Sequence, residues 1–188
     1  HFKSVPRGRY PAREAAAAAP VLPARQTRIE PKEQAILLIG YPGLDVKDPR
    51  RDALQILEGA LSGMSSALFE EIREKRGLAY FTGAAFRPGV EPGSFFFYAG
   101  TRPDALDEVE RLILAQAARV SREGLTPAEI ERARNQLIAA WEMSLQDNLN
   151  LALNAGLNEL YGLGHDYDFT IRRRLNAETG KRIERVAP

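Results

Sequence analysis

The stretch LAYFTGAAFRPGVEPGSFFFYAGT, residues 78–101, decides the fold because it contains two apolar segments joined by a turn. Its middle, RPGVEP at 87–92, holds two prolines and a glycine, which suit a turn and interrupt a strand. Strands that are neighbours in sequence and joined by a short turn pair antiparallel. We therefore expect an antiparallel hairpin of strands 78–86 and 93–101.

Two helices and another strand are predicted before this hairpin. The apolar run QAILLIGYPG at 34–43 predicts a strand buried on both faces, and thus a central one. A helix should follow from Pro49 to Gly63, because apolar residues recur there on one face. A second, short helix should begin at Ser65 or Ser66 and end near Arg76, with Gly77 as the left-handed residue that closes it.

Helices should fill the chain after the hairpin. We expect a first helix over 102–124 and a second that begins at the capping box TPAE (126–129) and continues through Leu145. A third should follow Asp147 and stop at Gly162 or Gly164. A last helix should span Ala177–Val186, capped by Asn176. Helices that cover one face of a mainly antiparallel sheet make an α+β two-layer sandwich. Residues 1–33, with five prolines, predict an interdomain linker or arm, and residues 34–188 predict one domain.

Composition excludes several classes of function. A formal net charge of +1 gives no general attraction to nucleic acid or to an anionic membrane. The absence of cysteine excludes disulfides and thiolate metal sites. No apolar run reaches the roughly 18 residues of a membrane-spanning helix. The first residues are basic and rich in proline without an apolar centre, so they do not predict a signal peptide.

Histidine is scarce, so the chain has few residues that could bind a metal ion or form a catalytic triad. The two histidines, His1 and His165, form neither H-x-x-E-H nor H-E-x-x-H, so the sequence predicts no histidine zinc site of its own. A serine triad would need His165, in the loop-like stretch 162–168, but no G-x-S-x-G accompanies it. A surface-loop histidine is the preferred interpretation.

The candidate site is REKRGLAY, residues 73–80. Arg73 should lie on the last helical turn and Tyr80 on the strand beyond Gly77, so the turn could bring a cationic fork and a neutral phenol together. Two such donors suit a carbonyl oxygen that gains negative charge during acyl transfer. The alternative is purely structural: a basic residue opposes the dipole of the helix end, and a tyrosine packs on a strand.

Other clusters have simpler interpretations. The aromatic residues 95–98 could stack bases, but no basic stripe is interleaved with them, and core packing is preferred. The carboxylates of Glu70, Glu71 and Glu74 could do acid–base chemistry, yet nearby cations favour a solvated charged face. The charged residues Glu129, Glu131, Arg132 and Arg134 are similarly interpreted as an exposed helix flank.

Several stretches together carry a resemblance to a known family. They are KEQAILLIGYPG (32–43), ALSGMSSALFEEIREKRGLAYFTGAAF (60–86), GSFFFYAGTRPDALDEV (93–109) and EGLTPAEIERARNQL (123–137). In this order they resemble the C-terminal, non-zinc half domain of pitrilysin/insulinase-type zinc metallopeptidases, a group that includes the mitochondrial processing peptidases. HFKSVPRGRYP (1–11) resembles the exit from a preceding homologous domain, and ERVAP (184–188) stops short of the final strand that such domains usually carry.

The resemblance implies a division of labour between two halves. Zinc is expected in a homologous partner half, upstream in the same polypeptide or in a separate subunit, with no metal or cofactor in this chain. The family's arginine and tyrosine, seven residues apart, match Arg73 and Tyr80 and reach a peptide substrate at the zinc. This chain should be inactive alone, and extended peptides should pair with a sheet edge.

Alternatives remain open at this point. The chain could be a non-catalytic structural subunit or a peptide-binding subunit of a heterodimer. No nucleic-acid partner and no membrane span are expected. The compartment stays undecided between the bacterial periplasm, which we favour slightly, and the cytoplasm.

Overall fold

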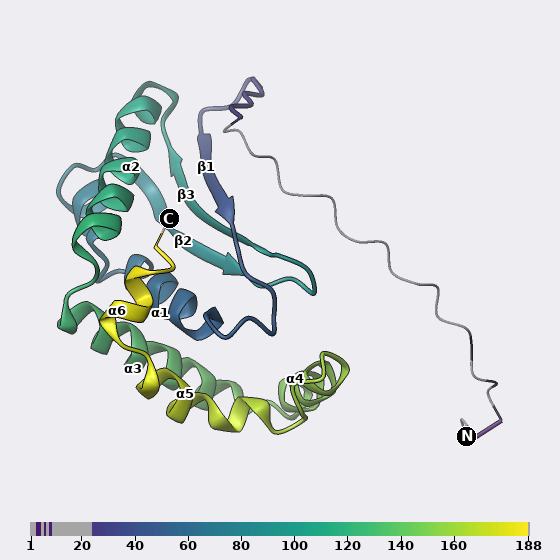
Figure 1. The fold of residues 1–188 in the computed structure, drawn as a ribbon. Helices are drawn as coiled ribbons and strands as arrows, with labels where there is room; N and C mark the ends of the chain where they lie inside the picture. Colours follow the sequence, from purple (N-terminus) through teal and green to yellow (C-terminus); the bar gives the residue numbers. More distant parts are fainter. Residues whose placement is uncertain (1–2, 5, 7, 9–23, 188) are drawn as a thin grey trace.

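The computed structural model describes residues 3–4, 6, 8 and 24–187. It contains an antiparallel sheet on which the helices pack (Figure 1). Within these residues the strands are β1 (Ala35–Pro42), β2 (Ala79–Arg87) and β3 (Ser94–Thr101), in the order β1-β3-β2. The predicted hairpin is confirmed as β2 and β3. Residues 24–34 form no helix or strand, and the alanine run of the predicted linker lies outside the described residues.

The position of β1 corrects the sequence-based prediction. β1 is an edge strand, not a central one, and its residues alternate between half-buried and exposed. Leu37 and Ile39 pack against the core, whereas Ile36 and Leu38 are 57% and 64% exposed on the opposite face. The apolar run is unbroken because the open face of the sheet is itself apolar, not because helices cover both faces.

Helices cover the other face of the sheet (Figure 1). The longer ones are α1 (Arg51–Leu61), α2 (Leu106–Glu123), α3 (Pro127–Ser144) and α4 (Asn148–Leu160). Shorter turns are the π-helix η1 (Phe69–Glu74) and the 3₁₀ turns η2 (Pro103–Ala105) and η3 (Tyr167–Thr170). The α+β two-layer prediction is therefore confirmed, as is the Thr126–Glu129 capping box that begins α3.

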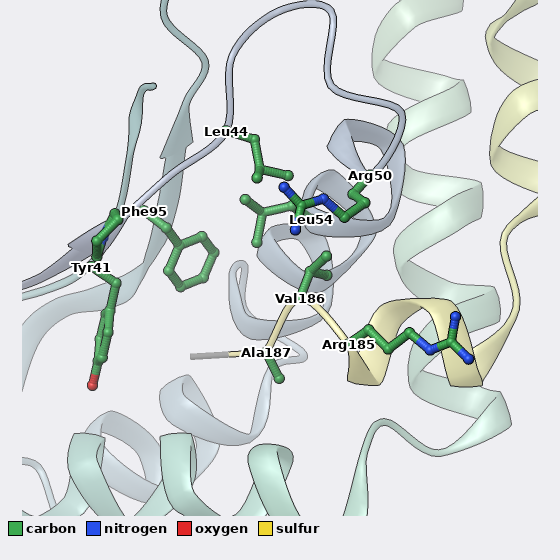
Figure 2. A pocket seen from close by; sticks show the side chains of 9 residues that line it. Tyr41, Leu44, Arg50, Leu54, Phe95, Arg185, Val186 and Ala187 are labelled. Carbon is green, nitrogen blue, oxygen red and sulfur yellow. The ribbon is translucent and has the colours of Figure 1, made fainter. Parts of the chain in front are cut away.

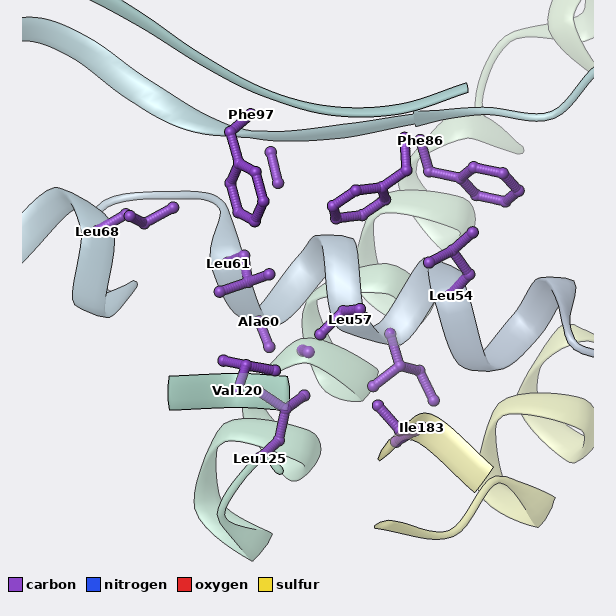
Figure 3. Packing of buried hydrophobic residues seen from close by; sticks show 14 of the residues in the cluster. Leu54, Leu57, Ala60, Leu61, Leu68, Phe86, Phe97, Val120, Leu125 and Ile183 are labelled. Carbon is purple, nitrogen blue, oxygen red and sulfur yellow. The ribbon is translucent and has the colours of Figure 1, made fainter. Parts of the chain in front are cut away.

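The core lies between the sheet and α1 (Figure 3). Phe95 and Phe97 point into it from β3, with their rings edge to face at a centroid distance of 5.5 Å. Leu54 and Leu61 of α1 point toward the sheet, and Val120 and Ile183 lie on the other side of α1 (Figure 3). Because the aromatic residues 95–98 alternate between the two faces, the core interpretation holds for Phe95 and Phe97.

The C-terminal helices differ from the prediction. Instead of one helix over 177–186, the structure has α5 (Ile171–Ala177) and α6 (Gly180–Glu184), separated by an extended Glu178. Asn176 therefore lies inside α5 and caps nothing. Ile171 and Leu175 are four residues apart and both buried. Because they form one apolar helix face, α5 begins before the expected cap at Asn176.

Arginine side chains tie this C-terminal segment to the rest of the domain. Arg134 Nε donates to the carbonyl oxygen of Leu175 at 3.0 Å. The interpretation as an exposed flank is wrong for Glu129, Arg132 and Arg134, which are half-buried, and holds for Glu131. Arg174 Nε donates to Asp52 Oδ2 at 2.9 Å, which joins α5 to the start of α1. Both contacts join residues far apart in sequence.

Glu58 gives a pH-dependent prediction for stability. Burial raises the pKa of this half-buried carboxyl on α1, opposed by the backbone N–H of Phe86 and the charge of Arg87. A pKa that is higher in the folded state means that stability is lost as pH rises through that pKa. Glu58→Gln should therefore stabilise the domain at pH 7 and lose that advantage below the pKa of the unfolded chain, as measured by urea unfolding at both pH values.

Glu131→Gln is the matched control, because it removes the same charge from an exposed position of α3. It should shift the urea midpoint less than Glu58→Gln at pH 7. An equal gain from Glu58→Gln at both pH values would contradict the assignment of the effect to the buried charge.

Candidate functional site

The segment that carries Arg73 is a widened helical turn. The Ser66 hydroxyl accepts a hydrogen bond from the Phe69 N–H at 3.2 Å and so caps its start, as predicted. The backbone then adopts π-helical geometry, in which Lys75 N–H donates to the Glu70 carbonyl at 2.9 Å, five residues back. Such single π turns occur frequently at functional sites. The sequence predicted a helix here but not its widening.

Gly77 reverses the chain as predicted, with φ of +61°. No atom lies within 4 Å of the position that a Cβ would take, so the backbone conformation, not space, is what favours glycine. The Gly77 N–H donates to the Arg73 carbonyl at 3.0 Å, and the Leu78 N–H donates to the carbonyl of the buried Ile72 at 2.9 Å. The helix end and the start of β2 are thus one hydrogen-bonded unit.

Tyr80 lies in an irregularity of the sheet. Ala79 pairs with Thr101 and Phe81 pairs with Gly100, so Tyr80 is the extra residue of a β-bulge. Tyr80 is 58% exposed and Phe81 40% exposed, whereas Ala79 is buried. A bulge redirects a side chain out of the regular alternation and is common next to active sites. This one presents the phenol of Tyr80 to solvent.

The cations of REKR have different surroundings. Lys75 pairs with Glu70 at 2.9 Å, and Arg76 pairs with Glu71 at 2.8 Å. Hydrogen bonds from Arg76 hold the pKa of Glu71 below its ordinary value, which supports the interpretation of these glutamates as a solvated charged face.

Arg73 makes no ion pair or hydrogen bond through its guanidinium to any residue that the structure describes. Its guanidinium lies over the Phe69 ring, 4.9 Å from the centroid. All five N–H donors of the exposed Arg73 therefore remain available to a ligand. The structure brings Arg73 and Tyr80 to the two sides of one tied turn and exposes both; their meeting at one carbonyl stays a prediction.

The other candidates offer less chemistry. His165 is exposed in the loop after α4, and its backbone N–H donates to Glu159 Oε2 at 3.0 Å. Among residues 3–4, 6, 8 and 24–187, no group of three or more histidine, aspartate or glutamate side chains could hold a metal ion. The described part of the chain therefore has no site that fits zinc.

A cavity of about 240 Å³ lies at the end of β1 (Figure 2). Its lining is mainly apolar, with Leu44, Leu54, Phe95 and Val186 among the residues, and Figure 2 shows Arg185 pointing away from it. Sequence reasoning missed this cavity because its lining comes from three distant parts of the chain. Among the described residues no carboxylate or histidine lines it, and its polar side chains include Tyr41 and Arg50.

The fold is that of an α+β domain with helices on one face of an antiparallel sheet, and its described residues form no metal-binding cluster. The chain belongs to the family described as the peptidase M16 inactive domain, whose model matches residues 1–137. The resemblance to the non-zinc half of pitrilysin/insulinase-type metallopeptidases is thereby confirmed. The family description calls this domain inactive, which agrees with a zinc that belongs to the partner half.

Relatives and solved structures agree with this assignment. A zinc protease of Streptomyces coelicolor, named as uncharacterized, is 41% identical over 129 residues, which cover 68% of this chain and 28% of that protein. The similarly named zinc protease YmxG of Bacillus subtilis is 32% identical over 162 residues, which cover 86% of this chain and 40% of YmxG. This chain thus spans well under half the length of these relatives.

Two solved structures show the same fold. The peptidase M16 inactive domain from Pseudomonas fluorescens superposes with a TM-score of 0.75 at 25% identity, covering 83% of this chain and 37% of that one. A protease from Helicobacter pylori gives a TM-score of 0.72 at 21% identity, with 82% and 37% covered. Within the described residues, no helix combines the length and apolar character needed to span a bilayer.

Proposed function

We propose that this domain is the non-zinc half of a zinc-dependent metalloendopeptidase that cleaves extended peptides, with Arg73 and Tyr80 binding the scissile carbonyl. The observation that carries the proposal is that two donors are exposed on either side of one hydrogen-bonded turn, with Arg73 free of ion pairs to described residues. The family supports a peptidase context. We further propose that residues 34–188 form this half domain and residues 1–33 its linker.

The chemistry follows from what the two side chains can donate. When a peptide carbonyl is attacked, its oxygen gains negative charge, and preorganised donors stabilise that charge. Arg73 offers a permanently charged planar fork, and Tyr80 offers a neutral O–H. Zinc in the partner half would supply the activated water for the attack. This chain's own part is to bind and orient the carbonyl.

The sheet edges limit how a peptide could pair with this half. The β2 edge is closed at Ala84, whose N–H donates to the Ser62 hydroxyl at 3.1 Å while that hydroxyl donates to the Ala84 carbonyl at 2.7 Å. Strand pairing that begins beside Tyr80 would therefore stop before Ala84. We propose that only a short stretch of substrate backbone pairs with β2.

Reconstitution tests the proposal. This chain, a zinc-bearing half from the same protein, and their mixture are each incubated with a fluorogenic extended peptide. We expect cleavage only in the mixture, and loss of cleavage after chelation of zinc, because donors and metal lie in different halves. Peptide binding without zinc-dependent cleavage by the mixture would instead support the non-catalytic alternative, and cleavage by this chain alone would overturn the division of labour.

A further inference from the structure

We infer that Phe69 is a positioning residue that holds the guanidinium of Arg73 in place for the substrate. This inference rests on the proposed function of Arg73 and extends it to a residue that does not touch the substrate carbonyl. The direct observation is the stacking of Arg73 over the Phe69 ring at 4.9 Å. Within the described chain, this is the one specific contact of the Arg73 side chain.

Phe69 is buried beside the contiguous core cluster without belonging to it. Its neighbours Leu68 and Ile72 are almost completely buried and belong to the contiguous core cluster. Phe69 is only 9% exposed, yet it is outside that cluster. The guanidinium of Arg73 lies above the ring of this buried aromatic side chain. Phe69 therefore gives the exposed Arg73 side chain a fixed surface to rest on.

The backbone brings the two side chains together. Phe69 and Arg73 begin and nearly end the π-helix η1, four residues apart, so they lie one above the other along the same side of this widened turn. The Arg73 carbonyl is fixed by the Gly77 N–H at 3.0 Å. The backbone of Arg73 is therefore held at the turn and its guanidinium is held over the ring.

Stacking suits a substrate-binding arginine better than an ion pair would. A carboxylate partner would occupy N–H donors of the fork, as Glu71 does for Arg76. A guanidinium over an aromatic ring is attracted by the ring's negative face, which uses none of those donors. Phe69 thereby restricts a long, flexible side chain while its hydrogen-bonding groups stay open.

The test is a double-variant cycle in the complete protease, with the zinc-bearing half present. Phe69→Met removes the ring at similar volume and should lower kcat/KM by about twofold to fivefold, the loss expected for a cation–π contact to an exposed cation. Phe69→Tyr keeps a ring and should retain most of the activity. In an Arg73→Ala background, Phe69→Met should cause no further loss, because Phe69 acts only through Arg73.

The outcomes separate the inference from the function on which it rests. If Arg73→Ala leaves kcat/KM unchanged, the proposed function fails. If Arg73→Ala lowers kcat/KM but Phe69→Met causes the same loss in both backgrounds, Phe69 is merely structural and the inference is overturned. Ile72→Val, a core change on the same turn, controls for lost stability and should leave kcat/KM unchanged. Phe69→Leu replaces Phe69→Met if the methionine variant does not fold.

Discussion

Replacing Arg73 by alanine should lower kcat/KM of the complete protease by about 10²- to 10³-fold, the usual cost of removing one donor to a developing oxyanion. The effect should be large because the guanidinium is charged and free of ion pairs to any described residue. Folding should change little, since the side chain is exposed and exposed substitutions usually alter stability by less than about 0.5 kcal/mol. Peptide cleavage kinetics and thermal unfolding of the same preparation measure both quantities.

Arg76→Ala is the matched control for this variant. Arg76 is the same residue type three positions along the chain, but its guanidinium is engaged by Glu71 and Glu108. It should leave kcat/KM close to that of the parent protein. Equal losses from both variants would show that general positive charge, not the unpaired fork of Arg73, supports cleavage, and the assignment of Arg73 would then fail.

Replacing Tyr80 by phenylalanine should lower kcat/KM by about tenfold, which corresponds to one neutral hydrogen bond of about 1.4 kcal/mol. The loss should be smaller than for Arg73→Ala, because the phenol carries no charge. The ring remains in the variant, so the β-bulge and the packing around it should persist. The measurement is the cleavage rate over a range of substrate concentrations, together with the unfolding midpoint.

Tyr98→Phe controls for the loss of any hydroxyl from the same sheet. Tyr98 lies on β3, and its ring centroid is 6.1 Å from that of Phe81, the residue next to Tyr80. Its hydroxyl should be dispensable for cleavage. If Tyr80→Phe is as active as the parent protein, the phenol donates nothing to the reaction, and only the packing of the ring on the strand would explain Tyr80.

The candidate site was predictable only in part. The spacing of Arg73 and Tyr80 around Gly77 is visible in the sequence, because a left-handed glycine after a helix is a local signal. The bulge at Tyr80 was not predictable, since it depends on the register of β2 against Thr101 and Gly100 of β3. The stacking of Arg73 on Phe69 was missed as well, although the four-residue spacing of an aromatic and a basic residue could have suggested it.

The contacts of the C-terminal helices could not be predicted from the sequence either. Arg134 looked like part of an exposed flank because a helix sequence does not show which later segment will pack beside it. The start of α5 before Asn176 goes with the burial of Ile171 and Leu175, which was not visible as a cap or a turn. Residues that meet across more than forty positions are brought together by packing, not by local propensity.

The sequence alone determined the elements whose causes are local. The β2–β3 hairpin followed from its turn residues, the start of α3 from the Thr126–Glu129 capping box, and the chain reversal from Gly77. Only the tertiary structure decided that β1 is an edge strand and that Arg73 and Tyr80 are exposed on one tied turn. The physical reason is that burial and register depend on which other segments lie against a residue, and those segments come from distant parts of the chain.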